Sequence, residues 1–474
     1  MESPSFFERF NQWSRNSVGL KLIAIGILIL ILLIPSFMIQ SVVRERQFRS
    51  TDVKNEITSK WGQSQNIIGP VLSVPYIQYT RDTKGVIVSS SRGYTHFLPE
   101  NLKIEGQLNP DILSRSIYDV VVYTADLKVK GNFVFPKAEE LNLSDFSFGW
   151  EDAMLSVGIS DMKGVSESLI AQWDGKEYAF NPGVGNIGIL NSGISVNVPI
   201  NDSDLKKEVY DFSVPLKLKG SQWLSFEPVG KNTTATLASS WANPSFDGGF
   251  LPVERSVTED GFTASWSVLN FNRSYPQQWV DAGYSFSEME GKGGDYFYNP
   301  YSDDMGEETR LQQSSAFGVN LLMPVETYQK NMRAVKYAVM TLFLTFLTFF
   351  FSEVLEKKRI HPIQYLLMGF AICLFYLLLL SLSEYINFSA AYFVGTVATA
   401  GLITAYSQSV FHNRRHTMLV GGVLLVLYGF FYSLLQLQDY ALLMGSFGLF
   451  GILALVMYLS RKLDWYNLGG RKES

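Results

Sequence analysis

The sequence is poor in the residue types on which many catalytic and metal sites depend. Its single cysteine, Cys373, lies in an apolar run, so an intrachain disulfide is impossible. Of its four histidines, only His96 lies in the polar middle of the chain. The 39 basic and 44 acidic residues give a net charge of −5, without the concentrated basic patch that nucleic-acid binding requires. These shortages exclude Cys–His catalysis in the middle region and predict no nucleic-acid partner.

The motifs of common enzymes and cofactor sites are also missing. Ser–His–Asp hydrolysis would have to centre on His96, but no G-x-S-x-G elbow accompanies it. Residues 183–188 have G-x-G-x-x-G spacing, yet Pro182 precedes them and a strand-like segment follows, which favours a flexible turn over a dinucleotide site. The remaining histidines, His361, His412 and His416, lack carboxylate or cysteine partners at ligand spacing. The sequence therefore predicts no catalytic residue, no cofactor and no metal site.

Long apolar runs near both ends of the chain predict a membrane protein. Residues 22–34 are apolar, and the uncharged stretch continues to Val43, which is long enough to span a bilayer. No A-x-A-like group of small residues follows this run, so we predict an uncleaved anchor rather than a signal peptide. Five further spans are predicted at residues 335–355, 363–384, 388–408, 417–436 and 440–460.

The loops between the five C-terminal spans differ in charge, and this difference predicts an orientation. The turns around 384–389 and 437–440 contain no Lys or Arg. The positive-inside rule places the basic loops and the tail in the cytoplasm, and counting back through six spans puts the N-terminus there too. The basic residues on the cytoplasmic side are Lys357, Lys358, Arg359, Arg414, Arg415, Arg461, Lys462, Arg471 and Lys472.

The middle of the chain alternates β-branched or aromatic residues with polar ones, which is the period of a strand. We predict strands that include 71–79, 117–129, 154–159, 194–198 and 262–268, with hairpin turns at Asp174-Gly175 and Asp260-Gly261. Residues 44–64 are predicted to form a helix that continues from the anchor. Residues 284–310 are rich in acids but lack the spacing of an EF-hand, which favours a long solvated loop over a calcium site.

These segments together predict an α + β membrane protein. We expect an N-terminal anchor, a large antiparallel β-rich periplasmic domain built as a sandwich or extended sheet, and a C-terminal five-helix bundle. The lipid bilayer is then the first partner, and the oligomeric state stays open. The predicted divisions are 1–43 for the cytoplasmic N-terminus and anchor, 44–333 for the periplasmic domain, 334–460 for the bundle and 461–474 for the cytoplasmic tail.

Two acids near the membrane spans are candidate functional residues, since ionisable groups in such segments often mark function. Glu353 lies four residues before Lys357, so an interfacial ion pair within one helix explains it most simply. Glu384 ends an apolar run at the predicted outer surface, where we expect its carboxylate to reach water. For both residues, this interfacial placement is favoured over proton transfer or ligand binding.

Several strings spread along nearly the whole chain form a recognisable set: Trp61-Gly62-Gln63, residues 69–76, Ser239-Ser240-Trp241, residues 243–248, Phe250-Leu251-Pro252, Tyr328-Gln329-Lys330, residues 333–337, 359–365 and 380–384. Together they resemble the CreD family of inner-membrane proteins, often described as cell-envelope integrity proteins. The resemblance implies a Gram-negative inner-membrane protein linked to envelope stress, and it implies no known reaction. Similar sequences often carry a histidine after the glutamate that corresponds to Glu384, whereas here Tyr385 follows. By motif position, His361 and Gln364 join Glu353 and Glu384 as candidates.

Three functions are compatible with these features. The first is a non-enzymatic envelope component that binds or scaffolds a periplasmic partner and contributes to envelope integrity and stress tolerance. The second is a transporter or signal relay that uses the C-terminal bundle. The third is an enzyme that modifies envelope polymers, with His96 or a carboxylate pair at its centre. The absence of a catalytic constellation favours the first.

Overall fold

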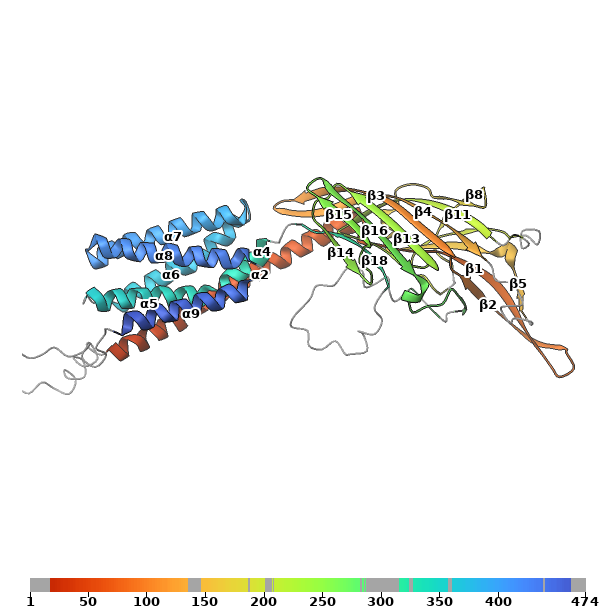
Figure 1. Cartoon of the computed structure of the whole chain (residues 1–474). Coiled ribbons are helices and arrows are strands. Elements are labelled where there is room, and N and C mark those ends of the chain that lie inside the picture. The colour runs from red at the N-terminus through yellow and green to blue at the C-terminus, as the bar shows by residue number, and fades with distance from the viewer. Residues whose placement is uncertain are drawn as a thin grey trace, which may run out of the picture. The chain divides into compact units, whose positions relative to one another are not determined.

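The structure, a computed structural model, describes residues 18–134, 146–185, 188–200, 207, 209–281, 284, 286, 315–323, 327–356, 360–437 and 440–461. The chain forms two compact units (Figure 1). The helical unit comprises Met1–Thr51 and Val325–Ser474, and the β domain comprises Asp52–Pro324. Helix α2 (Val18–Trp61) contributes residues to both units. The predicted anchor and the helix predicted at 44–64 are therefore one continuous helix.

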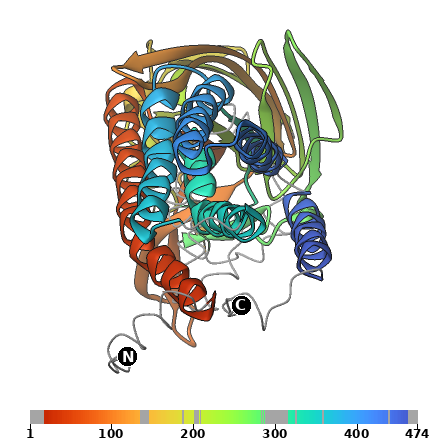
Figure 2. The same cartoon turned by 90° about the vertical axis from the view of Figure 1, so that its left-hand side faces the viewer.

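Among its described residues, the helical unit contains α2 and six C-terminal helices (Figure 2). By length and apolar composition, α2, α6, α7, α8 and α9 can each cross a membrane. Helices α4 and α5 are bent by 43° and pass the same test only as a pair, so the predicted total of six spans counts this pair as one broken span. The C-terminal helices are α4 (Thr327–Lys336), α5 (Ala338–Glu356), α6 (Pro362–Ser383), α7 (Phe388–Phe411), α8 (Arg414–Gln436) and α9 (Ala441–Ser460).

Helix α2 packs directly on α6. A Cβ atom added to Gly369 of α6 would lie 2.1 Å from Leu32 Cδ1, so only glycine lets the two helices approach this closely. One turn further along α2, the buried Ser36 Oγ lies 3.8 Å from Cys373 Sγ. The contact therefore extends over more than one turn of each helix. By contrast, the apolar window of α9 has no buried residue, which suits a helix that faces lipid.

The β domain consists of two sheets. The first has ten strands, with the order β14-β18-β12-β1-β6-β10-β9 and with β2, β5 and β17 attached at its side; the second has eight, in the order β15-β16-β13-β3-β4-β11-β7-β8. The strands of the first sheet are β1 (Gln65–Arg81), β2 (Ile87–Phe97), β5 (Phe146–Phe148), β6 (Met154–Ile159), β9 (Asn181–Pro182), β10 (Gly193–Asn197), β12 (Trp223–Phe226), β14 (Pro244–Gly248), β17 (Gln278–Val280) and β18 (Phe317–Leu321). Those of the second are β3 (Asn101–Arg115), β4 (Tyr118–Val134), β7 (Ile170–Trp173), β8 (Lys176–Ala179), β11 (Val209–Ser221), β13 (Asn232–Ser239), β15 (Glu254–Thr258) and β16 (Gly261–Leu269).

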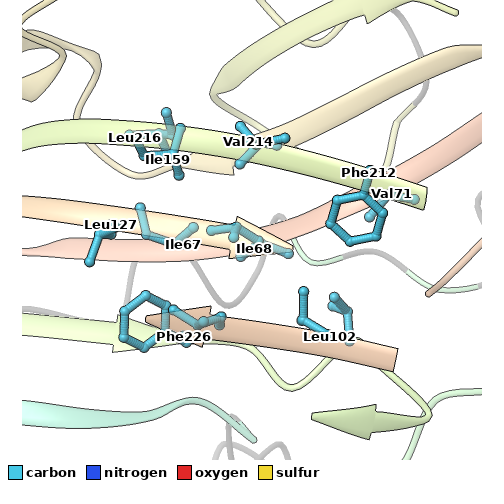
Figure 3. Packing of buried hydrophobic residues seen from close by; sticks show 14 of the residues in the cluster. Ile67, Ile68, Val71, Leu102, Leu127, Ile159, Phe212, Val214, Leu216 and Phe226 are labelled. Atoms are coloured by element: carbon cyan, nitrogen blue, oxygen red, sulfur yellow. The ribbon is translucent and has the colours of Figure 1, made fainter. Parts of the chain in front are cut away.

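The two sheets pack face to face around one hydrophobic core, so the domain is a sandwich (Figure 3). Alternate residues point inward along strands such as β11, β13 and β16, as the period-two pattern predicts, whereas the first part of β1 is buried on both faces. Figure 3 shows buried side chains of both sheets in this cluster, with Ile67 and Val71 from the first sheet and Val214 and Leu216 from the second. All four side chains are at most 2% exposed. The predicted α + β class is thus confirmed.

The prediction of an antiparallel domain needs one correction, because two strand pairs are parallel. Strand β1 pairs in parallel with β12, and β13 pairs in parallel with β3. The first case arises because the chain changes sheets at Gln222: β11 ends in one sheet at Ser221, and β12 begins in the other at Trp223. Both sheets are therefore mixed, although most neighbours are antiparallel.

Two of the turns predicted from the sequence lie in hairpins of the second sheet, and a third lies between β9 and β10. Asp174 and Gly175 form the predicted two-residue turn, both with positive φ, between the paired Trp173 and Lys176. The second hairpin is shifted by one residue, because Gly261 already pairs with Thr258. In the glycine-rich stretch 183–188, the three glycines have φ values of 98°, 63° and 70° and lie between β9 and β10, as predicted for a turn. The acidic loop predicted at 284–310 lies outside the described residues, apart from positions 284 and 286.

Candidate functional site: two acidic clusters beside the anchor helix

The four residues nominated from the sequence lie at the two ends of α6. Glu353 is near the end of α5, and His361 and Gln364 are at the start of α6. Glu384 is the C-cap of α6, at its other end. The structure therefore places three of them together and the fourth about 33 Å away along this 22-residue helix, at about 1.5 Å per residue.

Glu353 is buried and has three partners, which we call the Glu353 cluster. Lys21 of α2 forms an ion pair with Glu353 Oε1, which also accepts a hydrogen bond of 3.1 Å from the backbone N–H of Ile360. The hydroxyl of Tyr365 donates to Oε2 at 3.2 Å. The side chain of Glu353 is only 5% exposed. The predicted partner, Lys357, lies outside the described residues, and the ion pair that the structure shows joins two helices instead of lying within one.

His361 and Gln364 form the N-terminal cap of α6. The backbone N–H of His361 donates to Gln364 Oε1 at 3.0 Å, and His361 Nδ1 accepts from the backbone N–H of Ile363 at 3.3 Å. Pro362 occupies the first helical position, where its fixed φ suits a helix start. This reciprocal arrangement is a capping box. Its structural effect is to fix where α6 begins and hence where Tyr365 meets Glu353.

Glu384 forms a second cluster, the Glu384 cluster, at the opposite end of α6. The hydroxyl of Tyr328 on α4 donates to Oε1 at 3.1 Å, and Arg46 Nη1 of α2 lies 3.9 Å from Oε2. The side chain of Glu384 is 8% exposed, so most of its surface is covered by these neighbours. Next to it, the Asn331 side chain donates to Ser383 Oγ at 2.7 Å and holds α4 against α6.

The two clusters share one geometry: a cation of α2 and a tyrosine hydroxyl meet a carboxylate of the bundle. Lys21 and Arg46 are 25 positions apart, which is about 37 Å along a helix. This length is close to the thickness of a bilayer with part of its headgroup layers. Each cluster thus ties α2 to the bundle near one membrane face. Breaking a buried ion pair by removing one partner typically costs about 3–5 kcal/mol, whereas replacing both partners by neutral groups is often tolerated.

In the β domain, the one histidine that could serve catalysis is paired with a serine. Ser73 and His96 are opposite each other on β1 and β2, and Ser73 Oγ lies 2.8 Å from His96 Nδ1. Both side chains are completely buried, and His96 Nε2 has no hydrogen-bond partner among the described residues. Asp281 is near enough to influence His96 electrostatically, but its carboxylate accepts from the Tyr76 hydroxyl and the Tyr94 backbone N–H. A substrate cannot reach this serine without unfolding of the strands around it.

Burial controls the protonation of His96. It lowers the pKa of the imidazole to about 4, against a smaller opposing effect of the Asp281 carboxylate. The ring of Trp279 on β17, 5.4 Å from the imidazole between centroids, forms part of this apolar environment. His96 is therefore neutral at physiological pH and belongs to the core of the sandwich.

A second buried ionisable group in the β domain, Glu227, was not found from the sequence. Its side chain is 1% exposed and accepts a long hydrogen bond of 3.4 Å from the Tyr275 hydroxyl. Burial raises the pKa of Glu227 to about 8, although the nearby Arg273 acts in the opposite direction. The guanidinium group of Arg273 donates mainly to backbone carbonyl oxygens; for example, Nη1 donates to the carbonyl oxygen of Tyr275 at 2.6 Å. Glu227 is thus a protonated core residue at neutral pH.

Across the described ranges, no group of three or more His, Cys, Asp and Glu side chains is arranged to hold a metal ion. His412 ends α7 in a left-handed conformation, and His416 lies in the first turn of α8, where its Nδ1 is 3.1 Å from Asn413 Nδ2. The two histidines therefore belong to the turn that joins these helices.

The sequence comparisons match nearly the whole chain. A profile of the family described as "Inner membrane protein CreD" matches residues 17–466. The chain is also 33% identical, over 440 residues, to "Inner membrane protein CreD" of Escherichia coli (strain K12), and the match covers 92% of this chain and 91% of that protein. The chain belongs to the CreD family. It is accordingly an inner-membrane protein with several candidate spans and a β-rich domain.

For this CreD-family chain, sequence reasoning found both carboxylates but not their cationic partners. Lys21 and Arg46 flank the first apolar run, where basic residues read as topology signals rather than as ligands of an acid. The two tyrosines, Tyr328 and Tyr365, do stand in the strings that resemble the CreD family. Those strings are thus the signal from which they could have been nominated.

The buried His96 predicts a specific pH dependence of stability. The folded protein keeps His96 neutral down to about pH 4, whereas the unfolded chain binds a proton below its ordinary pKa of about 6.5. This contribution to stability is complete above pH 6.5 and is lost as the pH falls toward 4. Between pH 6.5 and pH 5 the loss is about 2 kcal/mol, from about 1.36 kcal/mol per pH unit.

Unfolding of the full chain in detergent, followed by tryptophan fluorescence, measures this effect, because seven of the nine tryptophans lie in the β domain. The His96→Gln variant is the control and should lack this part of the pH dependence. Equal pH slopes for the wild type and the variant would show that His96 is accessible to protons in the folded state.

Proposed function

We propose that this protein contributes to the integrity of the cell envelope and to stress tolerance by binding or scaffolding, without catalysis. In this proposal the β domain faces the periplasm and meets an envelope partner, while the helical unit holds it in the inner membrane. Both termini are cytoplasmic, and residues 44–333 are periplasmic. The family membership supports the membrane location, and the charges of the loops support the orientation.

The observation that carries the proposal is that both carboxylates of the bundle, Glu353 and Glu384, already have partners within the protein. A transporter would use Glu353 or Glu384 to bind a proton or a ligand. Each carboxylate is instead buried, has a cation of α2 beside it and accepts from a tyrosine hydroxyl. This arrangement favours a structural clamp that holds α2 on the bundle.

The burial of the ionisable groups His96 and Glu227 in the β domain favours binding over catalysis. The only histidine of this domain is buried in the core, and its raised-pKa acid, Glu227, is also enclosed. A sandwich of two mixed sheets offers large outer faces and strand edges to a partner. A signal relay is the second candidate, because α2 contributes residues to both units and could transmit a displacement.

Neutralising the Lys21–Glu353 pair in two steps distinguishes a clamp from a transport residue. Glu353→Gln alone leaves the Lys21 ammonium without its carboxylate, so we expect destabilisation of about 3–5 kcal/mol and less folded protein in the membrane. The double variant Lys21→Met with Glu353→Gln removes both charges and should recover the folded amount to within about twofold. Survival of a deletion strain under envelope stress should recover with it.

The double variant decides the outcome. If it accumulates like the wild type but fails to support survival, the carboxylate has a role in proton or ligand transfer, and the clamp proposal is wrong. Lys128→Met in the β domain is the matched control for loss of one exposed lysine and should change neither readout.

The orientation has its own test in intact cells. In a background with Cys373→Ala, we expect Ser90→Cys on β2 to react with a membrane-impermeant maleimide once the outer membrane is permeable. Ser409→Cys near the end of α7 should react only after the inner membrane is opened. Both positions are exposed, so burial does not prevent labelling. The reverse pattern would place the β domain in the cytoplasm.

A further inference from the structure

Six cations gather at the end of the helical unit that contains the Glu384 cluster. Three follow the apolar part of α2, and three lie on the short helix α4. They are at the same membrane face because Arg46 of α2 and Tyr328 of α4 both contact Glu384. The cations are Arg44, Arg46, Arg49, Lys330, Arg333 and Lys336.

Three of these cations already have partners in the protein. Arg46 lies beside Glu384, and Arg49 Nη2 donates to Glu45 Oε1 at 3.4 Å. Arg333 Nη2 donates to the carbonyl oxygens of Leu434 and Leu437, at the C-terminal end of α8. Arg46 and Arg333 thereby link α2 and α4 to other helices of the helical unit, whereas Arg49 is exposed and pairs with Glu45 one turn earlier on α2.

The other three form what we call the cationic belt: Arg44, Lys330 and Lys336. Arg44 and Lys336 are exposed, and Lys330 has only the ring of Phe388, 5.6 Å from its Nζ to the centroid. Among the residues that the structure describes, none of the three forms an ion pair with a carboxylate. The belt therefore presents positive charge that no carboxylate of the described residues pairs with.

Exposed apolar side chains adjoin the belt on its membrane side. On α2, Phe37 and Met38 precede Arg44 by about two turns and are 60% and 65% exposed. On α5, Val339 and Phe343 follow Lys336 and are 43% and 51% exposed. A cation next to a lipid-facing apolar strip matches a phospholipid, whose phosphate lies beside its acyl chains.

We propose that the cationic belt binds the phosphate-bearing headgroups of anionic phospholipids. The acyl chains of the bound lipids would lie along the exposed apolar side chains of α2 and α5. This site does not depend on which side of the membrane the β domain occupies, because the belt is placed by its contacts within the helical unit. It is also separate from the two acidic clusters, whose cations are already paired.

Lipid binding by the purified full chain tests the proposal. Native mass spectrometry in detergent would count the phosphatidylglycerol and phosphatidylcholine molecules retained by the wild type and by the triple variant Arg44→Gln, Lys330→Gln and Lys336→Gln. We expect the wild type to retain phosphatidylglycerol preferentially, and the triple variant to bind it at least about tenfold more weakly, because each basic residue near an anionic surface contributes roughly a fivefold factor and three are removed. Phosphatidylcholine retention should not change.

Two further variants control for charge and folding. Lys84→Gln with Lys128→Gln and Lys176→Gln removes the same charge from exposed positions of the β domain and should bind phosphatidylglycerol within about twofold of the wild type. The charge-preserving variant Arg44→Lys, Lys330→Arg and Lys336→Arg should retain the preference even if the glutamine variant folds poorly.

Three results would overturn the proposal. The first is equal phosphatidylglycerol binding by the wild type and the belt variant. The second is loss of the preference in the charge-preserving variant. The third is displacement of phosphatidylglycerol by an equal concentration of inorganic phosphate, which would identify a site for free anions rather than for lipid headgroups.

Discussion

A charged side chain that is held within a bilayer needs an opposite charge or water beside it. In this protein, that requirement joins the first membrane helix to the others. Glu353 near one face and Glu384 near the other are buried, and α2 supplies a cation to each. Between these clusters, the contacts are made by small or uncharged side chains: Leu32 lies against Gly369, and Ser36 lies within hydrogen-bond distance of Cys373. Van der Waals packing brings the helices together, and the ion pairs fix their rotation and register.

The buried ionisable groups of the β domain are neutral, whereas the buried carboxylates of the helical unit lie beside an opposite charge. His96 and Glu227 lie in the core of the β domain without a strong opposite charge, and burial shifts the pKa of each toward the neutral form, to about 4 and about 8. Both groups are therefore uncharged near pH 7. Their protonation is a consequence of packing, which is why a histidine opposite a serine does not make an active site here. The domain is left with its outer faces and strand edges for recognition.

Local periodicity predicted the elements of this fold well. Strand β6 has the predicted bounds, and the predicted spans fall on α2 and on α5 to α9, because apolar length and alternation are properties of short segments. The parallel pairing of β1 with β12 was not predictable, since it depends on a change of sheet at Gln222.

The ion pairs of the Glu353 and Glu384 clusters also could not be predicted from local sequence patterns. Glu353 and Glu384 were recognisable as acids near the membrane, but Lys21 is 332 positions from Glu353. Spans that are apolar on all sides do not reveal which face meets which neighbour, so their ion pairs cannot be derived from the pattern. His361 and Gln364 were nominated by motif position, and their observed roles as cap residues follow from the three-residue spacing that a capping box requires.

The most direct measurement of the central claim, that α2 is fixed on the bundle, is a disulfide between Ser36→Cys and the native Cys373. Ser36 Oγ lies 3.8 Å from the thiol, so mild oxidation in membranes should join the two helices. We predict that the bridge forms and that the oxidised protein supports survival under envelope stress as well as the reduced protein does. Failure of the bridge to form would contradict the packing of α2 on α6. A bridge that forms and abolishes survival would show that α2 must move for function.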